Sequence, residues 1–202
     1  MIYIFVEDEL SQAIVNKLLD YLERTENLEF PDRAFYNKNG CGNIKREMRK
    51  YNKIARTYPV IVLVDLNATE CAPLKKEEFI DFNKNEKLIF RIAIREVEAW
   101  LFADRKNFAS FLGVRIDRMP KKPEEIADPK KLLFDISRKS QKRVIKEDIP
   151  PEPGSLASIG KNYNGRLKEF VLQYWDINIA RNVLKNKSLD KALNAFSSIR
   201  LP

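Results

Sequence analysis

Short apolar runs alternate with amphipathic stretches through the first half of the chain. Continuous apolar or β-branched residues predict four strands, at 2–6, 33–36, 59–65 and 88–94. Apolar residues that recur every three or four positions predict helices over about 10–24, 43–56 and 96–104. Strands that alternate with helices in this way favour an α/β fold, with a parallel sheet covered on both faces.

The second half has shorter helical patterns, at 163–175, 179–184 and 189–196. Proline and charged residues at 120–129 and 147–153 are typical of exposed connections. We therefore expect residues 1–113 to form a parallel-sheet core flanked by helices. Residues 114–202 are expected to form a basic, mainly helical C-terminal extension packed on this core.

Composition removes several classes of chemistry. The chain has no histidine, which excludes imidazole as a base, nucleophile or metal ligand. Its two cysteines, Cys41 and Cys71, cannot build a disulfide framework. The apolar start is too short for a signal peptide, and no run reaches the roughly 20 apolar residues of a membrane helix. These features predict a cytoplasmic protein with no membrane partner.

Net charge favours an anionic partner, with nucleic acid ahead of a membrane surface or an acidic protein. Lysine and arginine exceed the acids by 37 − 29 = +8. Two basic clusters are candidates for phosphate contact: Lys45, Arg46, Arg49, Lys50 and Lys53, and then Arg138, Lys139, Lys142 and Arg143. The alternative is that these cations only form solvated faces, as charge runs commonly do.

Acids follow three of the predicted strands. Glu7 ends the first, Asp65 ends the central one, and Glu96 and Glu98 follow the last. In a parallel α/β sheet the carboxyl ends of the strands form the ligand crevice, so these acids could meet at one edge. Oxygen ligands without histidine favour Mg²⁺ or Mn²⁺, which suits phosphodiester chemistry. Equally, acids at strand ends cap helices and stay hydrated.

Several motifs resemble known families. The segments Ile4-Phe-Val-Glu7-Asp-Glu and Val-Ile-Val-Leu-Val-Asp65-Leu-Asn67 are similar to the glutamate and D-x-D motifs of the Toprim domain of topoisomerases, primases and overcoming-lysogenization-defect nucleases. The run from Arg91 to Asp104, containing R-E-V-E-A-W-L-F-A-D, looks like a family of small Toprim-like bacterial and archaeal proteins that are often encoded beside an ATPase. The resemblance covers nearly the whole chain.

The resemblance implies roles for particular residues. Glu7 would be a catalytic acid or base and a metal ligand, Asp65 a second ligand, and Glu96 and Glu98 further acids of the site. The chain departs from the pattern at three positions: Asp8 replaces a glycine, Ser11 a second acid, and Asn67 the second aspartate of D-x-D. An amide oxygen can coordinate a cation but carries no charge, so metal affinity is expected to fall.

Two functions follow as expectations. The first is a Mg²⁺-dependent Toprim-like nuclease or nuclease-like subunit that acts on DNA or RNA, in defence against foreign genetic elements such as phages, with a separate ATPase subunit implied by the resemblance. The alternative is a non-catalytic nucleic-acid-binding or protein-interaction module with a degenerate metal site, for which Ser11 and Asn67 are the sequence evidence. Trp100 and Trp175 are expected in the core rather than on a base-stacking surface. The oligomeric state stays open.

Overall fold

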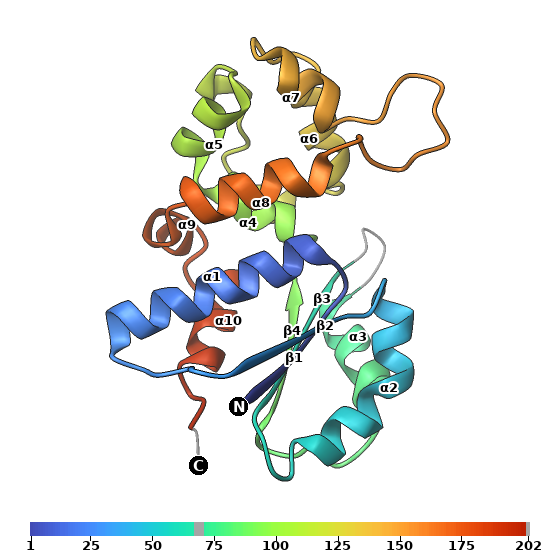
Figure 1. The fold of residues 1–202 in the computed structure, drawn as a ribbon, viewed down its shortest axis with the longest axis vertical. Helices are drawn as coiled ribbons and strands as arrows, with labels where there is room; N and C mark the ends of the chain where they lie inside the picture. Colours follow the sequence, from blue (N-terminus) through green and yellow to red (C-terminus); the bar gives the residue numbers. More distant parts are fainter. Residues whose placement is uncertain (67–70, 201–202) are drawn as a thin grey trace. The chain divides into compact units, whose positions relative to one another are not determined.

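The chain packs into two compact units (Figure 1). The computed structural model describes residues 1–66 and 71–200. The first unit comprises Met1–Ile94 together with Lys185–Pro202, and the second comprises Arg95–Leu184. The second unit is therefore inserted into the chain of the first.

A four-stranded parallel sheet forms the centre of the first unit. Its strands are β1 (Ile2–Val6), β2 (Arg33–Asn37), β3 (Val60–Asp65) and β4 (Leu88–Ala93), in the order β2-β1-β3-β4. The central strands are rich in Val and Ile, as expected for strands that are buried on both faces. The predicted α/β class and parallel sheet are confirmed.

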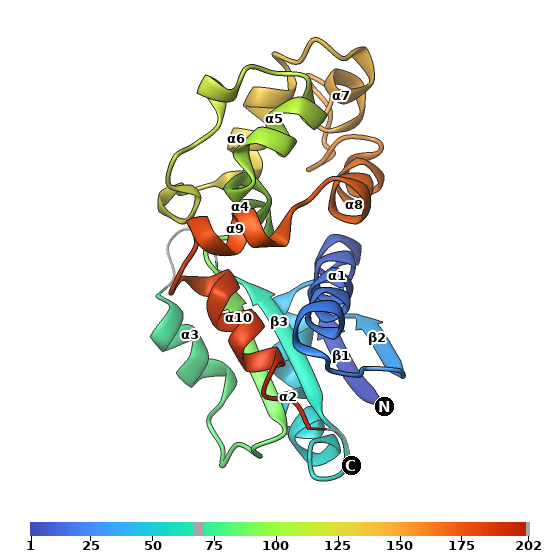
Figure 2. The same cartoon turned by 90° about the vertical axis from the view of Figure 1, so that its left-hand side faces the viewer.

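Helices cover both faces of this sheet, as Figures 1 and 2 show. On one face, α2 (Cys41–Ile54) and α3 (Ala72–Phe79) enclose a core that includes Phe5, Val62 and Phe90. On the other face lie α1 (Glu9–Glu26) and α10 (Ser188–Phe196), which contact each other. Helix α10 packs on β4 although the whole second unit separates the two in sequence.

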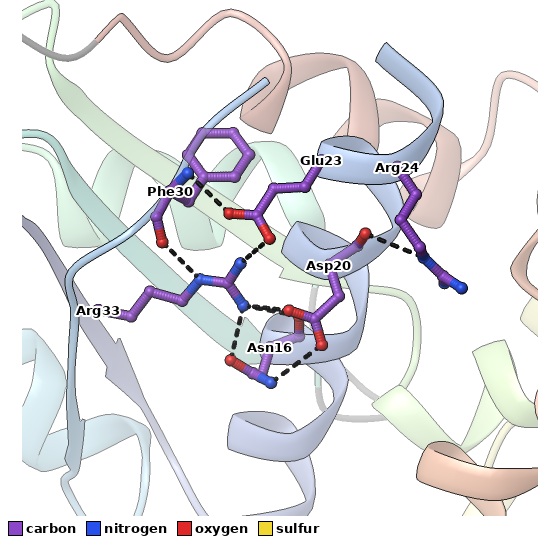
Figure 3. Close-up of polar contacts among 6 residues, drawn as sticks. All are labelled: Asn16, Asp20, Glu23, Arg24, Phe30 and Arg33. Atoms are coloured by element: carbon purple, nitrogen blue, oxygen red, sulfur yellow. Dashed lines mark hydrogen bonds and ion pairs between the residues drawn. The ribbon is translucent and has the colours of Figure 1, made fainter. Parts of the chain in front are cut away.

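A network of charged side chains attaches the edge strand β2 to α1 (Figure 3). The guanidinium of Arg33, only 12% exposed, binds Asp20, lies 2.7 Å from a carboxylate oxygen of Glu23, and donates to Asn16 Oδ1 at 2.8 Å. Glu23 also accepts the Phe30 N–H at 2.7 Å. Because β2 has only one neighbouring strand, this network gives it a second attachment, through side chains, to the helix on its face.

All regular secondary structure in the second unit, whose residues 95–184 are all described, is helical. Its helices are α4 (Val97–Ala103), α5 (Arg105–Leu112), α6 (Pro129–Ser137), α7 (Arg143–Asp148), α8 (Tyr163–Gln173) and α9 (Ile177–Val183), with 3₁₀ turns at Ile116–Arg118 and Pro123–Glu125. Its core includes an aromatic chain in which Phe108 contacts Phe102 and Phe170, with ring centroids 5.2 and 4.4 Å apart. Trp100 and Trp175 are buried, so both are core residues as predicted.

Two features of the architecture differ from the sequence-based expectations. Helix α3 was not predicted, because its apolar residues show no helical periodicity. The compact units also divide the chain after residues 94 and 184 rather than after residue 113. The physical reason is that α10 returns to β4, which joins the end of the chain to the sheet.

Candidate functional site

Glu7 lies where three elements of the first unit meet. It follows β1, and its side-chain oxygen Oε1 accepts the backbone N–H of Asp65, at the end of β3, at 2.8 Å. Its backbone carbonyl accepts the N–H of Gly40, which precedes α2, at 3.3 Å. Gly40 has φ +107°, a conformation that favours glycine and turns the chain into the helix. The structure thus brings Glu7 and Asp65 together at the carboxyl edge of the sheet.

The environment of Glu7 favours its protonated form. Burial raises the pKa of this carboxyl above its usual value, and the nearby charge of Asp8 adds to the rise. The backbone N–H groups of Asp65 and Cys41 and the charge of Lys75 oppose the shift without cancelling it. A carboxyl with a raised pKa can exchange a proton closer to neutral pH, as a general acid or base must.

Lys75 was missed in the sequence and belongs to the same edge of the sheet. It lies on α3, is only 3% exposed, and is close enough to Glu7 for its charge to lower the pKa of that carboxyl. Its ammonium also lies over the Phe79 ring, 5.8 Å from the centroid. Lysine is rarely buried unless a charge or ligand compensates it. Its only sequence signal is a lysine within a helix that has no amphipathic pattern.

Asp8 caps a helix, as the alternative for acids at strand ends predicted. Its side chain accepts the Ser11 N–H at 2.8 Å and begins α1. Ser11 itself is buried. Asp8 and Ser11 therefore meet in one N-cap, where aspartate satisfies a backbone N–H for which glycine has no side-chain acceptor.

Two acids of this edge are candidate ligands for a divalent cation. Glu7 and Asp65 supply carboxylates of the kind that hold Mg²⁺, which is commonly bound through one or two such groups, with water and substrate phosphate completing its shell. Over residues 1–66 and 71–200, no group of three or more acids or cysteines is arranged to hold a metal ion. Asn67, the third predicted ligand, lies outside the described residues.

Glu96 and Glu98 belong to the second unit, where they form a different constellation. Glu96 Oε2 accepts the Lys130 N–H, at the start of α6, at 3.0 Å. The Lys130 ammonium lies 3.7 Å from Glu96 and 3.5 Å from Glu98, and Glu98 also accepts the hydroxyl proton of Tyr163. Burial and the charge of Glu98 raise the pKa of Glu96. The structure therefore brings these two acids together around a lysine and a tyrosine.

Glu98 combines deep burial with an incomplete set of contacts. It is 1% exposed, and its Oε2 has no hydrogen-bond partner among the described residues. Unsatisfied buried carboxylate oxygens are uncommon, since each forfeits its hydration. Hydrogen bonding to Tyr163 and the charge of Lys130 make the other oxygen the anchored one.

The predicted basic residues of α2 fall into two groups. Lys45 pairs with Glu78, and Arg49 lies 2.9 Å from Asp81 and stacks over Phe82. These two cations are engaged by α3 and the segment after it. In the described part of the chain, Lys50 and Lys53 are exposed and form no ion pair, and Arg46 contacts only the side chain of Asn43. Contact of the five basic residues of α2 with nucleic acid stays a prediction.

The predicted basic residues of the second unit are also mostly engaged. Arg138 lies 3.2 Å from Asp135 and Arg143 2.6 Å from Glu147, while Lys139 is exposed. The ammonium of Lys142 donates to two backbone carbonyls, each at 2.9 Å. Lys142 borders a hollow of about 280 Å³, and these two carbonyls already accept hydrogen bonds from its ammonium. These residues offer fewer uncommitted charges than the sequence suggested.

Comparison with known proteins gives a family but no described activity. No described helix is long and apolar enough to cross a membrane. No match was found among curated proteins or among solved structures. One family model, described as Domain of unknown function (DUF4276), matches residues 5–198, and thus spans both units. Because that match covers nearly the whole chain, the protein belongs to the DUF4276 family.

Proposed function

We propose that this chain is a Mg²⁺- or Mn²⁺-dependent, Toprim-like nuclease or nuclease-like subunit that acts on phosphodiesters of DNA or RNA. The observation that carries the proposal is the junction of Glu7 with the end of β3: Glu7 Oε1 lies 2.8 Å from Asp65 N, with the buried Lys75 nearby. Defence against foreign genetic elements and a separate ATPase subunit belong to the same proposal and rest on the Toprim resemblance.

The side chains at this junction divide the chemistry among them. Glu7, whose pKa is raised by burial, accepts a proton from the attacking water or returns one to the leaving oxygen. Lys75 supplies positive charge where the phosphorane oxygens become more negative. Asp65 and Glu7 would hold the divalent cation, which when bound supplies Lewis-acid stabilisation of the phosphate.

A second candidate is a non-catalytic binding module that keeps the fold. One observation favours it: among the residues that the structure describes, no group of three or more acids or cysteines is arranged to hold a metal ion. Asn67 adds no charge in place of a third. In this case nucleic-acid binding would persist in the presence of a chelator, with a steep dependence on salt.

Calorimetric titration of Mn²⁺ into three proteins distinguishes the candidates. We expect the parent to bind the ion, Asp65→Ala to lose binding, and Asp32→Ala, which removes an exposed acid from the same unit, to bind as the parent does. Single- and double-stranded DNA and RNA are incubated with the same proteins, with and without Mn²⁺. Mn²⁺-dependent cleavage by the parent and by Asp32→Ala, but not by Asp65→Ala, supports a nuclease. Equal cleavage by Asp65→Ala would refute the proposed site, and binding without metal or cleavage would favour the module.

A further inference from the structure

A ladder of tyrosine rings lies on the α2 side of the sheet, at its β2 edge. The ring of Tyr3 on β1 stacks with Tyr36 on β2, with centroids 6.3 Å apart and planes 8° from parallel. Tyr58, just before β3, lies 5.5 Å from Tyr3 on its other side. Phe5 continues the row 5.1 Å from Tyr36 and joins it to the core. We define the tyrosine ladder as Tyr58, Tyr3 and Tyr36.

The outer members of this ladder are open to solvent. Tyr36 is 43% exposed and Tyr58 38%, whereas Tyr3 is partly buried between them. The cause is the position of α2, which packs on the central strands and leaves the face of the edge strand β2 uncovered. Cross-strand pairing places Ala34 opposite Tyr3, and this small residue leaves room for the flat arrangement of rings. Stacked, half-exposed aromatic rings offer further π-faces to a planar ligand.

Positive charge borders the ladder. Lys38 ends the β2 segment and pairs with Glu47 on α2 at 2.7 Å, which neutralises that acid. Lys50 is three residues further along α2, on the same side of the helix, and its charge reaches Glu47. Among the described residues, Lys50 has no ion-pair partner of its own. The border of the ladder therefore carries a surplus positive charge, unlike the opposite side of α2, where Lys45 and Arg49 are paired.

We propose that the tyrosine ladder is a binding surface for single-stranded nucleic acid. Unpaired bases stack on Tyr36 and Tyr58, and Lys50 contacts the phosphates between them. Stacking on aromatic rings beside a cationic groove is the means by which proteins hold single strands without reading their sequence. A duplex cannot use such a surface, because its bases are stacked on each other. The inference deepens the proposed function by naming its substrate class, and rests on it for the identity of the ligand as nucleic acid.

The ladder leads towards Glu7. Tyr36 pairs with Phe5, two residues before Glu7, so its backbone lies about 7 Å short of Glu7 along the strand direction. The turn after β2 stays beside that end, since Lys38 N donates to Val6 O at 2.9 Å. A nucleic-acid strand with a base stacked on Tyr36 would thus lie beside the carboxyl edge of the sheet, where Glu7 is.

Fluorescence anisotropy with labelled oligonucleotides of roughly 16 nucleotides tests the ladder. The probes are oligo-dT, oligo-U and a duplex of the same length, each titrated with the full chain in EDTA. We expect both single strands to bind more tightly than the duplex. Tyr36→Ala should weaken their binding about tenfold, whereas Tyr36→Phe, which keeps the ring, should stay within about twofold of the parent. Tyr174→Ala removes a tyrosine of the second unit that is 49% exposed, and should change nothing.

Salt dependence tests the phosphate contact separately. Lys50→Gln should reduce the slope of log K against log salt by about one, whereas Arg49→Gln, which removes a cation already paired with Asp81, should leave it unchanged. The ladder is refuted if Tyr36→Ala and Tyr58→Ala both bind single strands as the parent does, or if the duplex binds as tightly as the single strands. If the ladder is refuted but the parent cleaves nucleic acid with Mn²⁺, the nuclease proposal is still supported. If single strands bind through the ladder but are not cleaved, only the ladder proposal is supported.

Discussion

Replacing Glu7 by glutamine should stabilise the protein at neutral pH. The ionised carboxylate of Glu7 is disfavoured by burial and by Asp8, and its interactions with Asp65 N–H and Lys75 do not compensate fully, because its pKa remains raised. Glutamine keeps an oxygen for the Asp65 N–H but has no charge to desolvate. Removing this incompletely compensated charge should raise the free energy of unfolding by an amount on the order of 1 kcal/mol, which is typical of stabilising single substitutions.

The gain should depend on pH with a definite sign. A carboxyl whose folded-state pKa is raised stabilises the fold fully below its unfolded pKa, about 4.3, and loses that contribution as the pH rises through the folded pKa. The variant should therefore exceed the parent at pH 7 and converge with it as the pH falls towards 4. For a chain of this size, about 1 kcal/mol corresponds to roughly 2–4 °C in Tm.

Thermal unfolding followed by circular dichroism between pH 4 and pH 8 measures this difference. Glu77→Gln, which replaces an exposed glutamate on α3, is the control and should change stability by less than about 0.5 kcal/mol at any pH. A Glu7→Gln protein that melts below the parent at pH 7 would refute the burial argument, as would a gain that does not shrink in acid. Loss of cleavage together with a higher Tm would be the signature of a functional carboxyl kept at the expense of stability.

Three further changes test other parts of the structure. Arg33→Gln removes the charged contacts that hold β2 to α1 and should cost about 2 kcal/mol in urea unfolding at pH 7. Hydrogen bonds and the Arg33 charge outweigh burial and lower the pKa of Glu23, so this contribution is present above about pH 4.3 and fades as the pH falls through the folded pKa. An equal loss of stability at pH 3 would contradict this account. Tyr163→Phe deprives the buried Glu98 of its hydroxyl donor and should cost about 1–3 kcal/mol by the same assay, while an unchanged midpoint would show that the hydroxyl bond is worth nothing. Asp8→Ala removes the N-cap of α1 and should cost about 1 kcal/mol, which Asp8→Asn should largely restore; no recovery with asparagine would argue against capping.

Much of the sheet was predictable because its strands are short, apolar and separated by clear helical patterns. The runs ending at Val6 and Asp65 carry this signal most strongly, since strands buried on both faces contain almost no polar residues. Helix α3 carried no such signal, because only Lys75 and Phe79 of its eight residues are buried. A lysine in a buried position contradicts the usual hydrophobic pattern, so periodicity could not identify it.

The candidate site was predictable only in part. Strand ends gave Glu7 and Asp65, because a parallel sheet brings its carboxyl ends to one edge. The sequence could not reveal that Glu96 and Glu98 face Lys130 and Tyr163, since such contacts depend on how helices of the second unit pack. The same limit applies to the tyrosine ladder, whose members are separate in sequence and meet only through strand pairing.

The insertion of the second unit also determines when the first can be completed during synthesis. Residues 95–184 must be translated after β4 and before α10, which at bacterial to eukaryotic elongation rates takes roughly 5–20 s. Through this interval, the face of β4 that will receive Leu189, Leu193 and Phe196 has no cover from its own helix. The nascent chain therefore has to tolerate an open apolar sheet for seconds, a period in which a ribosome-associated chaperone would bind it most readily.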